Sequence, residues 1–110
     1  MTLDDLASYG ANVEEGLGRC MGMEPLYLKL CASIKEESKF DDLMSALEDG
    51  RLDEAFEAAH ALKGVLSNLA LTPLQQPVEE LTELLRSRTD MDYAPLAAQI
   101  MAERERFMAL

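Results

Sequence analysis

The chain of 110 residues has no tryptophan, a single histidine and only two cysteines. Zinc sites usually take several cysteine or histidine ligands, and Cys20 and Cys31 do not fit a metal-binding spacing. The Glu-x-x-His spacing of di-metal helical bundles occurs once, at Glu57 and His60, whereas such a site needs it twice. We therefore expect no metal or other cofactor, and two reduced, buried thiols.

Positive charge is also scarce, since 10 Lys and Arg face 21 Asp and Glu for a net charge of −11. Nucleic acids and anionic membranes bind proteins largely through Lys and Arg, so we expect neither as a partner. A basic or mixed protein surface is a better match. The chain has no apolar run of about 18 residues, and its start, MTLDDLASYG, lacks the pattern of a signal peptide. These absences favour a cytoplasmic protein that binds other proteins.

Aromatic residues make up 5% of the chain, and β-branched residues are few. Leu, Ala, Met and Glu dominate, which favours helices over strands. Gly and Pro separate segments with the i, i+3/i+4, i+7 apolar spacing of amphipathic helices. The expected helices cover residues 3–9, 13–19, 24–37, 39–49, 52–70, 72–88 and 90–108.

Short loops between the long segments predict antiparallel neighbours. We therefore expect an all-α single domain over residues 1–110, an up-and-down four-helix bundle with one or two short extra N-terminal helices. A break is expected near Ser38.

Several helix ends carry local signals. Thr72 followed by Pro73 suggests an N-cap and a first helical residue, and Pro77 predicts a kink or a late start. The last helix is expected to start at Asp90 or Asp92, with Pro95 tolerated in its first turn.

The single histidine lies on the longest pattern, residues 52–70. Its apolar stripe centres near Ala59 and Leu66, and at 100° per residue His60 is about 100° from that centre. The histidine is therefore expected to face solvent.

Lys63, Gly64 and Ser67 follow His60 at i+3, i+4 and i+7, on the same side of the helix. Gly64 lowers the stability of the helix by about 1 kcal/mol relative to Ala. Without a side chain, it leaves room for a large group to approach the imidazole. Lys63 places an ammonium group near the ring, which suits a phosphoryl group there. Each residue also has a plainer interpretation: a solvated histidine, a solvated lysine and a glycine kept for packing.

The segment AAHALKGVLSNLA, residues 58–70, resembles the signature of histidine-containing phosphotransfer (HPt) domains. Ala59, His60, Leu62, Lys63, Gly64 and Asn68 match that signature. The resemblance extends to residues 13–31, 47–60 and 92–107, and so to most of the chain. The family's usual Gly about ten residues after the histidine is Ala70 here, which leaves the end of that helix open.

The resemblance implies a phosphorelay intermediate of two-component signalling. His60 would accept a phosphoryl group from a receiver-domain aspartate and pass it to another, with receivers of hybrid sensor kinases and response regulators as partners. Lys63 would offset phosphoryl charge, Gly64 would give clearance, and Ser67 would hydrogen-bond nearby. Mg²⁺ is expected on the receiver and not on this chain.

No Gly-rich phosphate loop or kinase nucleotide motif is present, so we expect a monomeric phosphoprotein that is not an enzyme. The alternative is a helical-bundle interaction module without phosphotransfer. The sequence does not identify the cognate kinase, the regulator, the signal or the direction of phosphoryl flow.

Overall fold

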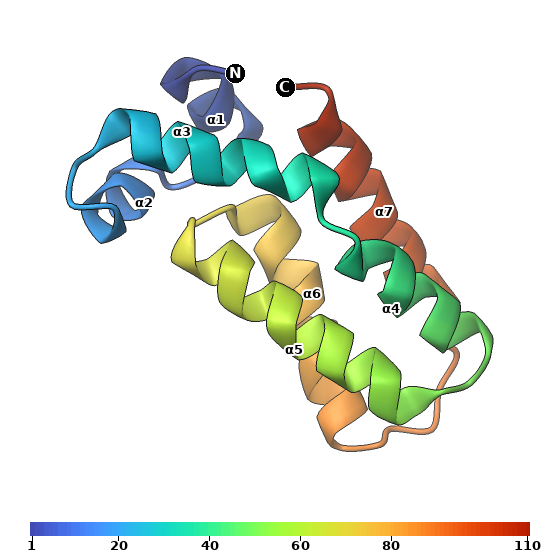
Figure 1. Cartoon of the computed structure of the whole chain (residues 1–110). Helices are drawn as coiled ribbons and strands as arrows, with labels where there is room; N and C mark the ends of the chain where they lie inside the picture. Colours follow the sequence, from blue (N-terminus) through green and yellow to red (C-terminus); the bar gives the residue numbers. More distant parts are fainter.

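The computed structural model describes residues 1–110 as seven α-helices, one 3₁₀ helix and no strand. Four helices alternate in direction (Figure 1): α4 (Lys39–Glu48), α5 (Leu52–Asn68), α6 (Thr72–Arg86) and α7 (Ala94–Met108). The N-terminal helices α1 (Leu3–Tyr9), α2 (Val13–Arg19) and α3 (Glu24–Ser33) gather at the end of the bundle where α5 finishes (Figure 1). The prediction of an all-α, up-and-down bundle is confirmed.

The helical stretch that begins with α3 is interrupted before α4, as expected. α3 tightens into the 3₁₀ helix η1 (Ile34–Glu36), and Glu37 then has extended backbone, with φ −73° and ψ 113°. Ser38 precedes α4, so the predicted break near Ser38 is confirmed.

The start of α6 differs from the prediction. Leu71 is the N-cap, and Thr72 is the first helical residue instead of the cap. The Thr72 hydroxyl donates to the carbonyl of Ala70 at 3.4 Å, and no side chain caps the start of α6. A late start at Pro77 is also wrong, because α6 continues through this residue. In the second turn Pro77 forfeits only one backbone hydrogen bond, the one to the carbonyl of Pro73.

The last helix starts at Ala94, later than the predicted Asp90 or Asp92. The Tyr93 hydroxyl donates to the carbonyl of Thr89 at 2.6 Å and holds the preceding residues in a turn. The carboxylate of Asp92 accepts from the N–H of Ala94 at 3.0 Å, just outside the helix. Pro95 lies in the first turn, as predicted.

Helix α5 ends at Asn68, two residues before the predicted end. Ala70 has a φ of 54°, in the left-handed region, which costs a non-glycine residue about 1–2 kcal/mol. This strain explains physically why a glycine suits the position. Ala70 is buried, and its carbonyl accepts from the N–H of Asn12 at 2.9 Å.

Aromatic contacts attach the N-terminal helices to the bundle. The rings of Tyr9 and Phe107 meet edge to face with centroids 5.5 Å apart. The hydroxyl of Tyr27 is buried and donates to the carbonyl of Leu69 at 2.9 Å.

Cys20 and Cys31 are buried and form no disulfide, as predicted. The chain contains no helix that combines the length and apolar character needed to cross a membrane.

Candidate functional site

Helix α5 presents a buried face and an outer face. Ala55, Ala59, Leu62 and Leu66 are buried in the core. His60 is exposed, so the prediction that it faces solvent is confirmed. The histidine lies near the middle of a 17-residue helix, where the backbone is held rigidly on both sides.

The imidazole of His60 rests on an aromatic ring one turn earlier. The rings of Phe56 and His60 are stacked, with centroids 5.6 Å apart and planes 12° from parallel. Helical side chains tilt toward the N-terminus of their helix, which brings the histidine back over the residue at i−4. Phe56 is half-buried. The sequence did not single out Phe56 for the site, although the i, i+4 spacing signals its contact with the histidine.

A cation on α6, the guanidinium of Arg86, approaches this aromatic pair. The guanidinium carbon of Arg86 lies 5.1 Å from the centroid of the Phe56 ring, within the range of a cation–π contact. The sequence did not single out Arg86, because its place beside α5 depends on how the two helices are aligned.

Lys63 lies one turn after His60 and points toward α6. Its Nζ is 3.7 Å from Oε1 of Glu83, while Oε2 of the same carboxylate is 3.3 Å from Nε of Arg86. One carboxylate thus holds two cations: Arg86, which contacts the Phe56 ring, and Lys63, which starts one turn from His60. Lys63 is therefore engaged within the chain and is not an isolated solvated charge.

Gly64 has open space above it. Apart from its chain neighbours and the adjoining backbone of α5, a methyl group built on its backbone would have no heavy atom within 4 Å, the side chain of His60 included. The alternative in which Gly64 is kept for packing within the chain is therefore wrong. The expectation that any side chain here would crowd the imidazole is also too strong, because the ring leans toward Phe56 and away from Gly64.

The Ser67 hydroxyl points to α6, not to the imidazole. It donates to Oε1 of Glu79 at 3.3 Å, and the same oxygen accepts from Gln75 at 3.0 Å. The Ser67 carbonyl accepts from the guanidinium of Arg19, which ties α2 to the end of α5. Seven residues correspond to a rise of about 10 Å, so the structure does not bring this hydroxyl to His60.

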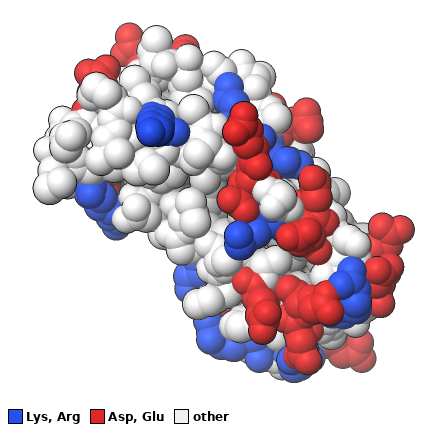
Figure 2. All heavy atoms as spheres, viewed as in Figure 1, with Lys and Arg blue, Asp and Glu red and all other residues white.

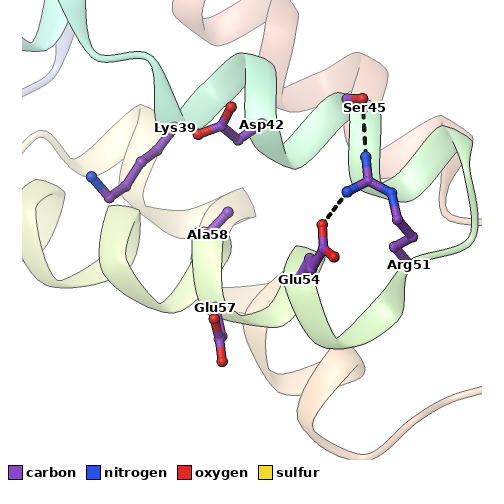
Figure 3. A pocket seen from close by; sticks show the side chains of 7 residues that line it. All are labelled: Lys39, Asp42, Ser45, Arg51, Glu54, Glu57 and Ala58. Carbon is purple, nitrogen blue, oxygen red and sulfur yellow. Dashed lines mark hydrogen bonds and ion pairs between the residues drawn. The ribbon is translucent and has the colours of Figure 1, made fainter.

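Acidic side chains surround the start of α5. On the face that Figure 2 shows, acidic side chains gather around α4, whereas the part of this face over α2 and α3 carries few charges. A groove of about 470 Å³ between α4 and α5 lies among these acidic side chains. Its Arg51 is satisfied internally, by Glu54 and by Ser45 Oγ at 3.2 Å, while Glu57 points away from α4 (Figure 3). His60 does not line this groove.

The comparison with protein-family models matches the Hpt domain over residues 29–109, about three quarters of the chain. The match begins inside α3 and includes the whole bundle and His60. No curated protein and no solved structure matches the chain. Hpt domains are phosphotransfer carriers of two-component and phosphorelay signalling that interact with receiver domains, and they are not kinases. With most of its length matched, the chain belongs to the Hpt domain family.

Proposed function

We propose that the chain is a phosphorelay intermediate in which His60 accepts a phosphoryl group from an aspartate of one receiver domain and passes it to an aspartate of another. One observation carries this proposal: the only histidine of an Hpt-family chain is exposed at the middle of its longest helix. A phosphoacceptor must meet the donor aspartate directly, and an exposed ring meets that requirement.

The transfer is a single displacement at phosphorus. The ring nitrogen of His60 that carries no proton forms the P–N bond while the P–O bond to the receiver aspartate breaks, and the aspartate leaves as a carboxylate. Onward transfer is the reverse step on a different receiver. Such reactions depend on positioning and charge stabilisation and need little covalent chemistry from the protein.

The neighbours of His60 have supporting roles in this proposal. Lys63 offsets charge on the phosphoryl group, since its side chain starts one turn from the ring. Gly64 gives the receiver a clear approach, which is supported by the open space above its backbone. Ser67 hydrogen-bonds at the edge of the docked receiver after its hydroxyl leaves Glu79.

The protein acts in this scheme as a monomeric carrier without nucleotide turnover. Its partners are receiver domains of hybrid sensor kinases and response regulators, and any Mg²⁺ belongs to the receiver. Docking is favoured toward the part of the face in Figure 2 that carries few charges, over α2 and α3, because the acidic side chains near α4 would repel the receiver's carboxylates.

The experiment that tests the proposal uses radiolabelled, phosphorylated receiver domains from the same organism. The wild type should take up alkali-stable, acid-labile label, and a second receiver should remove it. The His60→Gln variant should fold, because the side chain is exposed, and should take up no label.

Label on another residue, or label retained in His60→Gln, would contradict the proposal. If the wild type binds receivers but never acquires phosphate, the chain is an interaction module. In that case His60→Gln should keep its biological activity, and in a relay it should lose it.

A further inference from the structure

Five side chains form one connected set around the proposed phosphoacceptor. His60 stacks on Phe56, Arg86 lies over the Phe56 ring, and Glu83 binds both Arg86 and Lys63, which returns to α5 one turn from His60. All the members outside α5 come from α6. In this set the two cations, Lys63 and Arg86, share a single carboxylate as their counter-ion.

The charges in the set change when the histidine is phosphorylated. A phosphoryl group carries close to two negative charges near pH 7. On His60 it would lie one turn from Lys63 and next to the Phe56 ring that Arg86 contacts, and these are the two cations that Glu83 binds. Glu57, one turn before His60, is exposed and makes no ion pair, so it adds negative charge and no cation. The phosphoryl group and Glu83 therefore compete for Lys63 and Arg86.

The existing ion pairs are weak enough to be exchanged. The contact between Lys63 and Glu83 is 3.7 Å long, and their side chains are 32% and 58% exposed. Partly exposed ion pairs of this kind contribute little to stability, whereas charge-assisted contacts to phosphate oxygens are stronger. Lysine and arginine side chains are also long enough to move without a change in the backbone.

Building on the phosphoacceptor role proposed above for His60, we propose that Glu83 is a positioning residue that holds Lys63 and Arg86 in the unphosphorylated protein and yields both to the phosphoryl group. Glu83 thereby sets how strongly the protein retains phosphate, because the energy of releasing the two cations is subtracted from the stability of the phosphorylated state. A carrier that must both accept and donate phosphate needs a phosphorylated state that is not too stable, and Glu83 limits that stability. Glu83 acts only through these cations and does not touch the reacting atoms.

The test measures how phosphate partitions between a receiver aspartate and His60, approached from both directions. The partition reports the stability of the phosphorylated state, whereas a change in docking alters the forward and reverse rates together. Glu83→Gln should shift the partition toward His60 by about two- to fivefold, as expected for one partly screened charge contact. The shift should shrink in high salt.

The matched control is Glu80→Gln, which removes the same charge from an exposed position of α6 that makes no ion pair. It should leave the partition near the wild-type value. In a background that carries both Lys63→Gln and Arg86→Gln, the effect of Glu83→Gln should disappear, because the cations through which Glu83 acts are gone.

Three outcomes overturn the inference. In the first, Glu83→Gln has the wild-type partition while His60 is phosphorylated, which leaves the relay function intact. In the second, Glu80→Gln has an equal effect, which indicates general charge repulsion. In the third, the effect persists without Lys63 and Arg86, which indicates direct repulsion by Glu83. If His60 never becomes phosphorylated in the wild type, the proposed function fails and this inference fails with it.

Discussion

The imidazole of His60 lies nearly parallel to the ring of Phe56, with centroids 5.6 Å apart. We expect this contact to orient the imidazole. It uses neither ring nitrogen, so both remain available for hydrogen bonding or bond formation. A nucleophile that attacks phosphorus needs such control of direction, because misplacement by about 1 Å can cost about a hundredfold in rate.

Replacement of Phe56 tests this orientation. Phe56→Leu removes the aromatic surface under His60 and the contact with Arg86, and we expect transfer to slow by about five- to tenfold. Phe56→Tyr keeps the ring and should transfer at close to the wild-type rate. Single-turnover transfer from a phosphorylated receiver measures both, and thermal unfolding checks that both are folded. Equal rates in the two variants would show that the stack does not orient the histidine.

Gly16 and Gly18 provide a matched pair of glycines on α2. A methyl group at Gly16 would overlap with the ring of Tyr27, whereas one at Gly18 would meet nothing within 4 Å. The Tyr27 ring cannot withdraw easily, because it is buried and its hydroxyl donates to the carbonyl of Leu69. Gly16→Ala should therefore lower the free energy of unfolding by about 1–3 kcal/mol.

Gly18→Ala should raise the free energy of unfolding by up to about 1 kcal/mol, since Ala is the better helix residue. Urea unfolding of the two variants gives both values in one series. A Gly16→Ala protein as stable as Gly18→Ala would mean that α2 moves away from α3 at little cost.

The sequence predicted the parts of the site that α5 provides by itself. Helical periodicity fixes the direction of His60, and the same rule places Lys63 and Gly64 beside it. The rule says nothing about the neighbouring helix, because the alignment of α5 and α6 depends on how their side chains interdigitate. Glu83 and Arg86 could therefore not be assigned to the site before the structure placed them opposite Lys63 and Phe56.

The helix ends were predicted less well than the helices, for local reasons. Thr72 has the side chain of a good N-cap, yet Leu71 takes that position and the Thr72 hydroxyl bonds to the carbonyl of Ala70. The late start of α7 depends on the Tyr93 hydroxyl and the carbonyl of Thr89. Capping preferences alone do not contain such contacts.

Burial raises the pKa of the Cys31 thiol to about 11, and Cys20 nearby adds to this rise while Tyr27 opposes it. The folded protein therefore holds this proton more tightly than the unfolded chain, whose thiols titrate near 8.5. The resulting stability is fully present below the unfolded pKa and is lost as the pH rises toward 11. We expect the free energy of unfolding to fall over this range.

The Cys31→Ala variant should show a shallower fall with pH, whatever its absolute stability. Urea titrations at several pH values between 8 and 11 measure both slopes. Cys31 also contributes to the raised pKa of Tyr27, so the difference between the slopes includes this coupling. Parallel slopes for Cys31→Ala and the wild type would show that this thiol does not contribute to the alkaline loss of stability.

Substitution of Gly64 distinguishes an effect on the approach of the receiver from an effect on packing within the bundle. A methyl group at this position meets no atom of the chain beyond the adjoining part of α5, so Gly64→Ala should raise helix stability by up to about 1 kcal/mol. Gly64→Gln should also fold, because its side chain projects into open space. Any slowing of transfer therefore arises when the receiver docks and not from damage to the bundle. We expect a small slowing for Ala and a much larger one for Gln, whose side chain extends back over the preceding turn toward His60.

The measurement pairs thermal unfolding with single-turnover transfer for the wild type and both variants. Asn68→Ala is a useful control, since Asn68 is exposed on the same helix two turns beyond His60 and its truncation adds no bulk. A Gly64→Gln protein that is folded and transfers at the wild-type rate would show that the receiver does not approach over this turn. The clearance role would then be wrong, and support for the phosphoryl group would have to come from Lys63 and from Arg86 on α6.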